Sequence, residues 1–263
     1  MDYLFIGRLL LSFVIAGTWV SLTSLLAEKL GSKIGGLIAS LPSVIVITLI
    51  FIGLDRGRSF AAQTAAAVPI GMLVNTGFLL VFIATARFGA FRAAGLSLCT
   101  WLGLTLLFNL LPPFGLGLGS LLYSTGTLLA FLVAEYPLRV RSVPKQSLRF
   151  SWLTFTLRAF FSGSVVAAAV ALSRVAPPYL TGIIAAFPAV MLSTMTILTK
   201  VRGAAFAAAT GKIMLISMSS IIVYAALTAF LFGPLGLALG SLIGYAGAAV
   251  WLFVFRLVLR RVH

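Results

Sequence analysis

Long apolar segments follow one another along almost the whole chain. There are nine, each about 20 residues or longer, the length that a helix needs to cross a bilayer, and short breaks at charged residues, proline or glycine separate them. Transmembrane β-strands would instead alternate apolar and polar residues, and backbone polar groups in lipid must be paired within a helix. We therefore expect an all-α polytopic membrane protein with nine transmembrane helices, at approximately residues 7–27, 34–54, 61–86, 93–111, 114–136, 151–173, 179–199, 204–231 and 234–257.

The composition leaves almost nothing for a soluble domain. Hydrophobic residues make up 61% of the 263 residues and charged residues only 9%, and the mean hydropathy is +1.17. Soluble domains carry about 25% charged residues because their surface faces water. The lipid bilayer is therefore the expected partner of nearly the whole chain. The first segment is too long for the core of a signal peptide, so we expect it to remain as a helix.

The basic residues predict an orientation. A net charge of +15 would suit a nucleic-acid partner, but these residues lie between apolar segments and do not gather with aromatic side chains, so none is expected. Successive loops alternate sides, and cytoplasmic loops collect Lys and Arg. We therefore predict an external N-terminus and a cytoplasmic C-terminus. This places four basic residues outside and thirteen inside: Arg8, Arg56, Arg58 and Arg174 against Lys29, Lys33, Arg87, Arg92, Arg139, Arg141, Lys145, Arg149, Lys200, Arg202, Arg256, Arg260 and Arg261.

Two stretches of the chain resemble each other at an offset of 146 residues. GGLIASLPSVIVIT (35–48) matches TGIIAAFPAVMLST (181–194), and Arg56-Gly57 matches Arg202-Gly203. We infer two four-helix repeats, 1–111 and 151–263, joined by a fifth span and a basic loop (112–150). An odd number of helices separates the repeat starts, so the repeats would be inverted, as in many secondary transporters. A competing match, GLGLGSL (115–121) with GLALGSL (236–242), would pair the fifth span with the ninth in the same direction.

The second repeat also resembles a known family. YLTGIIAAFPAVM (179–191), the basic turn KVRG (200–203) and two following apolar spans that end in a Trp-containing helix resemble GlpM, a family of small four-helix bacterial inner-membrane proteins. The likeness covers residues 158–255 best and 8–111 more loosely. It implies a bacterial inner membrane and, through the family's association with alginate production, the envelope. This chain departs from the family in being doubled, and the family has no agreed activity.

Two prolines mark the candidate substrate site. Pro42 and Pro188 occupy the same place in each repeat, and each should break its helix because proline removes a backbone hydrogen bond and clashes with the preceding turn. The half-helix N-termini could then hold an anion; the alternative is a simple packing bend. Gly35-Gly36 and Thr181-Gly182 should let another backbone approach closely. Polar side chains expected at this site are Ser43, Thr48, Asn75 and Thr194.

Two basic residues fall inside apolar segments. Arg158 and Lys212 lie about 10 to 12 Å along their helices from the cytoplasmic side. No acidic partner for Lys212 occurs within a span, so its charge would attract an anionic substrate if it faces a cavity, or anchor the helix if it faces head groups. Arg158 would bind the same solute unless its span simply begins later.

The remaining polar residues exclude several functions. All four acids lie at span ends, at Asp2, Glu28, Asp55 and Glu135, so buried carboxylates for proton or sodium coupling are not expected. One cysteine and one terminal histidine offer no metal site, and no cofactor is expected. The chain carries no acid, base and nucleophile constellation, so we do not expect an enzyme.

These observations lead to two functional hypotheses. The first is a permease for a small anionic, phosphorylated or lipid-linked solute, with a closed cavity lined by Thr48, Asn75, Thr194 and Lys212. The second is a non-transporting subunit that supports envelope polysaccharide synthesis or export, which should be solidly packed at that place and carry an apolar groove outside. A homo-oligomer is compatible with either.

Overall fold

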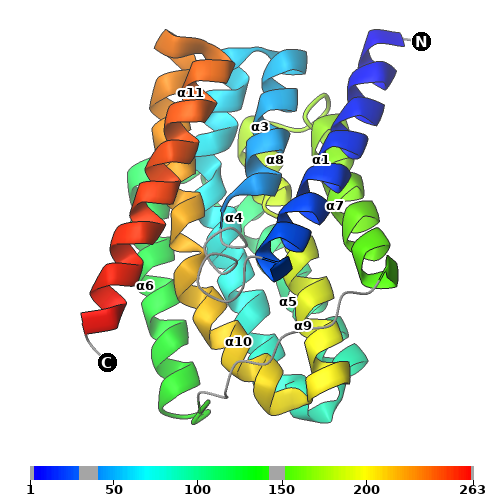
Figure 1. The fold of residues 1–263 in the computed structure, drawn as a ribbon. Helices are drawn as coiled ribbons and strands as arrows, with labels where there is room; N and C mark the ends of the chain where they lie inside the picture. Colours follow the sequence, from blue (N-terminus) through cyan, green and yellow to red (C-terminus); the bar gives the residue numbers. More distant parts are fainter. Residues whose placement is uncertain (1–2, 30–40, 142–151, 262–263) are drawn as a thin grey trace.

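The chain folds into a bundle of helices (Figure 1). The computed structural model describes residues 3–29, 41–141 and 152–261, and within these ranges it contains no strand, which confirms the all-α expectation. The helices are α1 (Tyr3–Lys29), α3 (Ser43–Arg56), α4 (Arg58–Thr85), the 3-10 turn η1 (Ala86–Phe88), α5 (Ala90–Leu110), α6 (Leu116–Glu135), α7 (Trp152–Leu172), α8 (Pro178–Ala185), α9 (Ala189–Arg202), α10 (Ala204–Ser217) and α11 (Ser219–Arg261).

Seven helices of the described ranges are long and apolar enough to cross a membrane. This number differs from the expected nine for two reasons. Only 14 residues of the second segment form a described helix, α3. The eighth and ninth segments count as one because α10 and α11 form a nearly continuous stretch, Ala204–Val254, of 51 residues. Non-helical backbone at Gly236 (φ 75°, ψ 177°) interrupts α11, however.

Helix α4 forms the centre of the bundle. In its apolar part 72% of residues are buried, against 28% in α5 and 22% in α6, and it packs against α3, α5, α6, α8, α10 and α11. Small residues allow close approach to α8: a Cβ added at Gly182 would lie 2.5 Å from the Thr64 carbonyl oxygen. This confirms the close backbone contact expected at Gly182; Gly35 and Gly36 lie outside the described residues.

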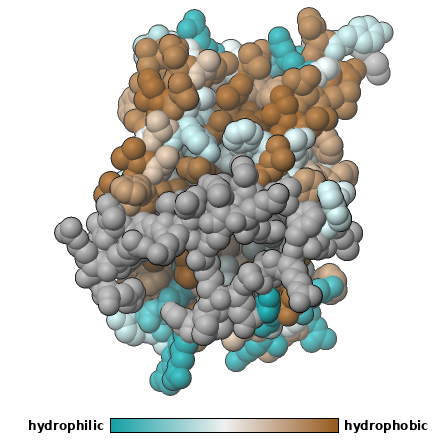
Figure 2. All heavy atoms as spheres, in the orientation of Figure 1, coloured by the Kyte–Doolittle hydropathy of each residue, from teal (hydrophilic) through white to brown (hydrophobic). Residues whose placement is uncertain are grey.

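The outer surface is apolar between two more polar ends. Figure 2 shows hydrophobic residues over most of the visible described face and hydrophilic residues toward the top and bottom. Large side chains on the outward faces of α5, α6 and α11 are half to three-quarters exposed, among them Leu102, Leu106, Leu128, Leu129, Phe230 and Val250. Such a continuous exposed apolar surface is unfavourable in water and fits a multi-pass membrane protein. The two ends of the chain lie at opposite ends of the bundle (Figure 1).

Four glycines of the described residues have positive φ, and each precedes a helical segment. Gly57 (φ 88°, ψ 164°) precedes α4, and Gly203 (φ 87°, ψ 167°) precedes α10. Gly89 (φ 104°, ψ 152°) precedes α5, and Gly236 separates the two parts of α11. A side chain is strained in this region of backbone space, so glycine is the residue that makes these abrupt turns.

Helices α1 and α7 pack against each other through glycine. A Cβ at Gly17 would lie 2.8 Å from the carbonyl oxygen of Ala159, and one at Gly163 would lie 2.6 Å from that of Phe13. The contact is therefore reciprocal: Gly17 and Gly163 differ by 146 positions, as do Phe13 and Ala159. Along the contact the residue number rises on one helix while it falls on the other, so the two helices run antiparallel.

Candidate functional site

A described helix begins directly after each of the two prolines that the sequence singled out. Helix α8 ends at Ala185 and α9 begins after Pro188 (φ −82°, ψ 44°), which confirms the expected break. Pro42 has nearly the same backbone (φ −76°, ψ 44°) and precedes α3; the residues before position 41 lie outside the described ranges. In both places the proline carbonyl accepts the first helical hydrogen bond, from Val46 at 3.0 Å and from Leu192 at 2.7 Å.

The helices that follow the two prolines have the same length. Each proline is followed by a helix of 14 residues that ends in an Arg-Gly turn, a length of about 21 Å at 1.5 Å per residue. Figure 1 shows α3 running toward the end of the bundle that holds the N-terminus and α9 toward the opposite end. Helix α7 packs against both α3 and α9.

Asn75 closes the break between α8 and α9. Its Nδ2 donates to the carbonyl oxygen of Ala186 at 2.6 Å, and the Trp101 indole donates to its Oδ1 at 3.1 Å. Ala186 lies between the two helices, so its carbonyl needs a partner from outside the helix. The ring of Trp101 also packs edge-on against Phe187 at 4.9 Å. One amide thus links α4 and α5 to the broken helix.

The other expected polar residues lie on α3 and α9. Ser43 is buried on α3, while the Thr48 hydroxyl donates to the Val44 carbonyl of its own helix at 2.8 Å. Thr194 is half-buried on α9. Thr48 and Asn75 are 0% and 1% exposed, so both side chains are packed against other described residues.

Lys212 lies elsewhere, in a cleft near the end of α6. Its Nζ forms an ion pair with Glu135 and donates to the Val140 carbonyl oxygen at 2.9 Å. The expectation that Lys212 lacks an acidic partner is therefore wrong. Glu135 lies at the end of one predicted span, and Lys212 lies two turns into another. The pattern of residues within each span does not indicate that α6 and α10 are neighbours. Arg158 belongs to α7, but its side chain lies outside the described part of the structure.

The cleft around Lys212 is lined mainly by basic groups. Its volume is about 410 Å³, and its lining consists of Glu135, Arg139, Val140, Arg141 and Lys212. Two backbone hydrogen bonds, from Leu138 to Val133 and from Val140 to Ala134, fold the segment after α6 back over the helix end. This turn presents the Val140 carbonyl to Lys212.

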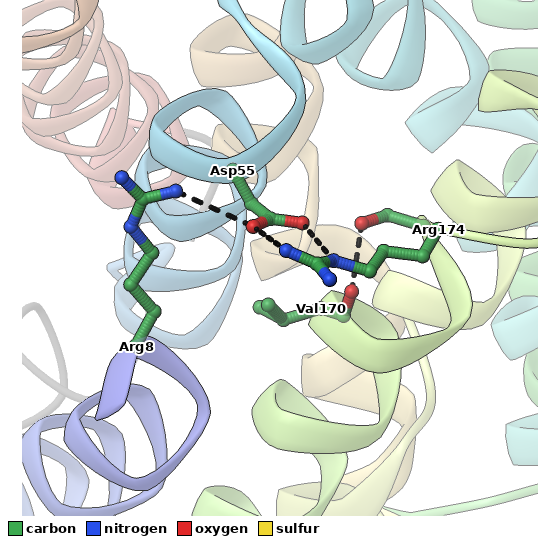
Figure 3. A network of polar contacts seen from close by, with 5 residues as sticks. Arg8, Asp55, Val170 and Arg174 are labelled. Atoms are coloured by element: carbon green, nitrogen blue, oxygen red, sulfur yellow. Dashed lines mark hydrogen bonds and ion pairs between the residues drawn. The ribbon is translucent and has the colours of Figure 1, made fainter. Parts of the chain in front are cut away.

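A second ion cluster, at the other end of the bundle, was not among the expected site residues. The Arg174 guanidinium donates two hydrogen bonds of 2.8 Å to the Asp55 carboxylate, and Arg8 donates a longer one, of 3.4 Å, to the same group (Figure 3). The Asp55 side chain is only 1% exposed. The hydrogen bonds and charge of Arg174, with those of Arg8, hold the pKa of Asp55 below its usual value.

This cluster ties together α1, α3 and the turn after α7. Arg174 also lies over the ring of Phe5, 3.6 Å from its centre. The charge distribution contains a signal for the cluster: Arg8, Asp55 and Arg174 all fall on the predicted external side. Asp55 is one of only two acids in the sequence, with Asp2, on that predicted side, which makes it a partner for these basic residues.

Comparison with known proteins adds one family. Residues 9–109 are similar to DUF3147, a protein family of unknown function. No curated protein and no solved structure matches the chain.

Proposed function

We propose that the protein is an inverted-repeat permease for a small anionic solute, phosphorylated or lipid-linked, in the bacterial inner membrane. The observation that carries the proposal is the break at Pro188 together with the matching helix start at Pro42. Pro42 and Pro188 have the same backbone conformation and are each followed by 14 helical residues and a positive-φ glycine. Paired discontinuous helices within the membrane are a recurring basis of substrate sites in transporters built from inverted repeats.

The repeat has further support in the packing. If a twofold axis relates the two repeats, each contact between them occurs twice, with the two partners exchanged. The contacts Gly17–Ala159 and Phe13–Gly163 are related in this way. The conformation of Gly236 resembles that of Gly89 and differs from that of Gly115 (φ −69°). This favours pairing the ninth span with the fourth over the competing match with the fifth. The family match, 9–109, also covers nearly the first repeat alone.

Nine crossings complete the proposed topology. The stretch of 51 residues from Ala204 to Val254 would be about 76 Å long as a helix, more than twice the hydrocarbon thickness of about 30 Å, so we place two crossings there with the turn at Gly236. The ion contacts fit this alternation. Arg8, Asp55 and Arg174 meet at the proposed external end, while Lys212 meets Glu135 at the proposed cytoplasmic end.

The proposed transport step moves the two repeats relative to each other. The hydrogen bond from Asn75 to Ala186 joins α4 of the first repeat to the break in the second. It must lengthen or exchange partners when the repeats rock. The structure then represents a closed conformation, in which Asn75 donates a hydrogen bond to the Ala186 carbonyl. In the open conformation this carbonyl would face the solute.

One observation favours the non-transporting subunit instead. Thr48 and Asn75 are almost completely buried, and such solid packing is what a scaffold for an envelope polysaccharide machine would have at this place. The two proposals predict different results in a flux measurement.

The test is solute flux in vesicles that contain the purified full chain. The probes are radiolabelled inorganic phosphate and a fluorescent phosphatidic acid, and Pro188→Ala is compared with Pro112→Ala, which alters an exposed loop proline. The permease predicts flux of at least one probe, a clear decrease in Pro188→Ala and no change in Pro112→Ala. Equal flux in both variants would refute the site at the break, and absence of flux for both probes would favour the subunit.

A further inference from the structure

We infer that the cleft between α6 and α10 binds a phosphate monoester group. Three cations and one carboxylate line it, Arg139, Arg141 and Lys212 with Glu135. Their sum is a net charge of about +2, which matches the charge of −1.5 to −2 that a phosphate monoester carries near neutral pH.

Two of the cations are free to receive a ligand. Within the described part of the chain, the guanidinium groups of Arg139 and Arg141 have neither an ion-pair nor a hydrogen-bond partner, and both residues are exposed. Arginine offers several N–H donors in a planar fork that matches phosphate oxygens, so two such groups on one cleft favour phosphate over a monovalent ion.

The backbone holds these arginines in place. Arg139 has a φ of 49°, the left-handed region that a residue other than glycine occupies at a cost. The hydrogen bonds from Leu138 and Val140 back to α6 and the contact of Lys212 with the Val140 carbonyl fix the turn in this shape. These contacts hold the backbone on both sides of Arg139 against α6 and α10.

Glu135 completes the site as a displaceable anion. Its carboxylate pairs with Lys212, yet its side chain is 42% exposed while that of Lys212 is 14% exposed. An incoming phosphate can take over the lysine while Glu135 turns into solvent. Glu135 thus competes with the ligand, and its removal should strengthen binding.

Two sources of this group are compatible with the cleft. It lies at the proposed cytoplasmic end of the bundle, where basic pockets between transmembrane helices contact lipid head groups, and it is also open to soluble phosphate compounds. Its role as an entry point for solute rests on the proposed permease function, but the binding itself does not.

The test measures binding without flux, on the full chain in phosphatidylcholine nanodiscs at constant salt. The probes are inorganic phosphate and phosphatidic acid, and phosphatidylglycerol serves as a phosphodiester comparison. The double variant Arg139→Gln/Arg141→Gln should weaken binding by about tenfold or more, and Glu135→Gln should tighten it severalfold. The matched control Arg87→Gln/Arg92→Gln removes two basic residues from the same end of the bundle and should leave the affinity unchanged.

Each outcome decides the proposal. Cleft-dependent binding of phosphate identifies a soluble ligand, and cleft-dependent binding of phosphatidic acid alone identifies a lipid. No binding of either probe, or equal losses in the cleft and control variants, would overturn the inference. A cleft that binds phosphate in a protein without flux of either probe would favour the non-transporting subunit and leave the site intact.

Discussion

A single buried amide organises the centre of the molecule. Asn75 satisfies both a carbonyl released by the proline break and the indole N–H of Trp101. An unpaired amide in an apolar interior is costly, which is why the sequence alone pointed to Asn75. The identity of its partners was not predictable because they come from the α8–α9 break and α5, and no local pattern connects these to α4.

Removing this amide should destabilise the fold. Asn75→Leu keeps a similar volume but leaves the Ala186 carbonyl and the Trp101 indole without their partner, at a cost of about 1–3 kcal/mol for each unsatisfied group. The measurement is the free energy of unfolding in mixed micelles. The same change at Asn109, which is exposed on α5, is the matched control and should have little effect; equal effects would contradict the assigned role.

The lowered pKa of Asp55 should make the stability of the fold depend on pH. Its pKa in the folded protein lies below the usual 3.8, so the ionised carboxylate stabilises the fold fully above that value and loses this contribution as the pH falls through the lowered pKa. The Tm of the parent should exceed that of Asp55→Asn at neutral pH, and the difference should shrink in acid. A difference independent of pH would show that the ion cluster does not contribute through charge.

At the scale of helices, the sequence predicts breaks better than neighbours. Proline and positive-φ glycine act on the backbone next to them, so the break at Pro188 and the matching turns at Gly57 and Gly203 followed from the pattern. The ion pair of Lys212 with Glu135 did not, because it depends on which helices pack together. The Asp55 cluster was partly predictable. Its three residues fall on the same predicted side of the membrane, but they are far apart in the sequence, so their contact could not be inferred.

The contact between α1 and α7 makes a quantitative prediction. Gly17→Ala and Gly163→Ala each place a Cβ within 3 Å of a backbone carbonyl oxygen of the partner helix. Helices cannot yield there without moving apart, so each variant should lose about 1–3 kcal/mol of stability. Gly7→Ala, on the same α1 helix with nothing within 4 Å of the new Cβ, should be neutral or slightly stabilising. Unequal losses at the two reciprocal glycines would argue against a twofold contact.

At the scale of the whole molecule, the proposed architecture consists of two repeats that cross the membrane in opposite directions. The proposed orientation rests on the basic residues, and the proposed relation between the repeats rests on an offset of 146 residues. The sequence could not reveal how the repeats pack, because apolar helices in lipid offer many equivalent surfaces. The glycine contact of α1 with α7 and the central place of α4 required the structure.

The most direct test of this claim is to determine which side of the membrane each of two equivalent positions faces. Ser59 and Ala205 are exposed, differ by 146 and are the second residues of α4 and α10. Each is changed to cysteine in a background with Cys99→Ala, and whole cells are treated with a membrane-impermeant maleimide. Inverted repeats predict that Ser59→Cys reacts from outside and that Ala205→Cys reacts only after the cells are permeabilised. Reaction of both from the same side would contradict the inverted repeat.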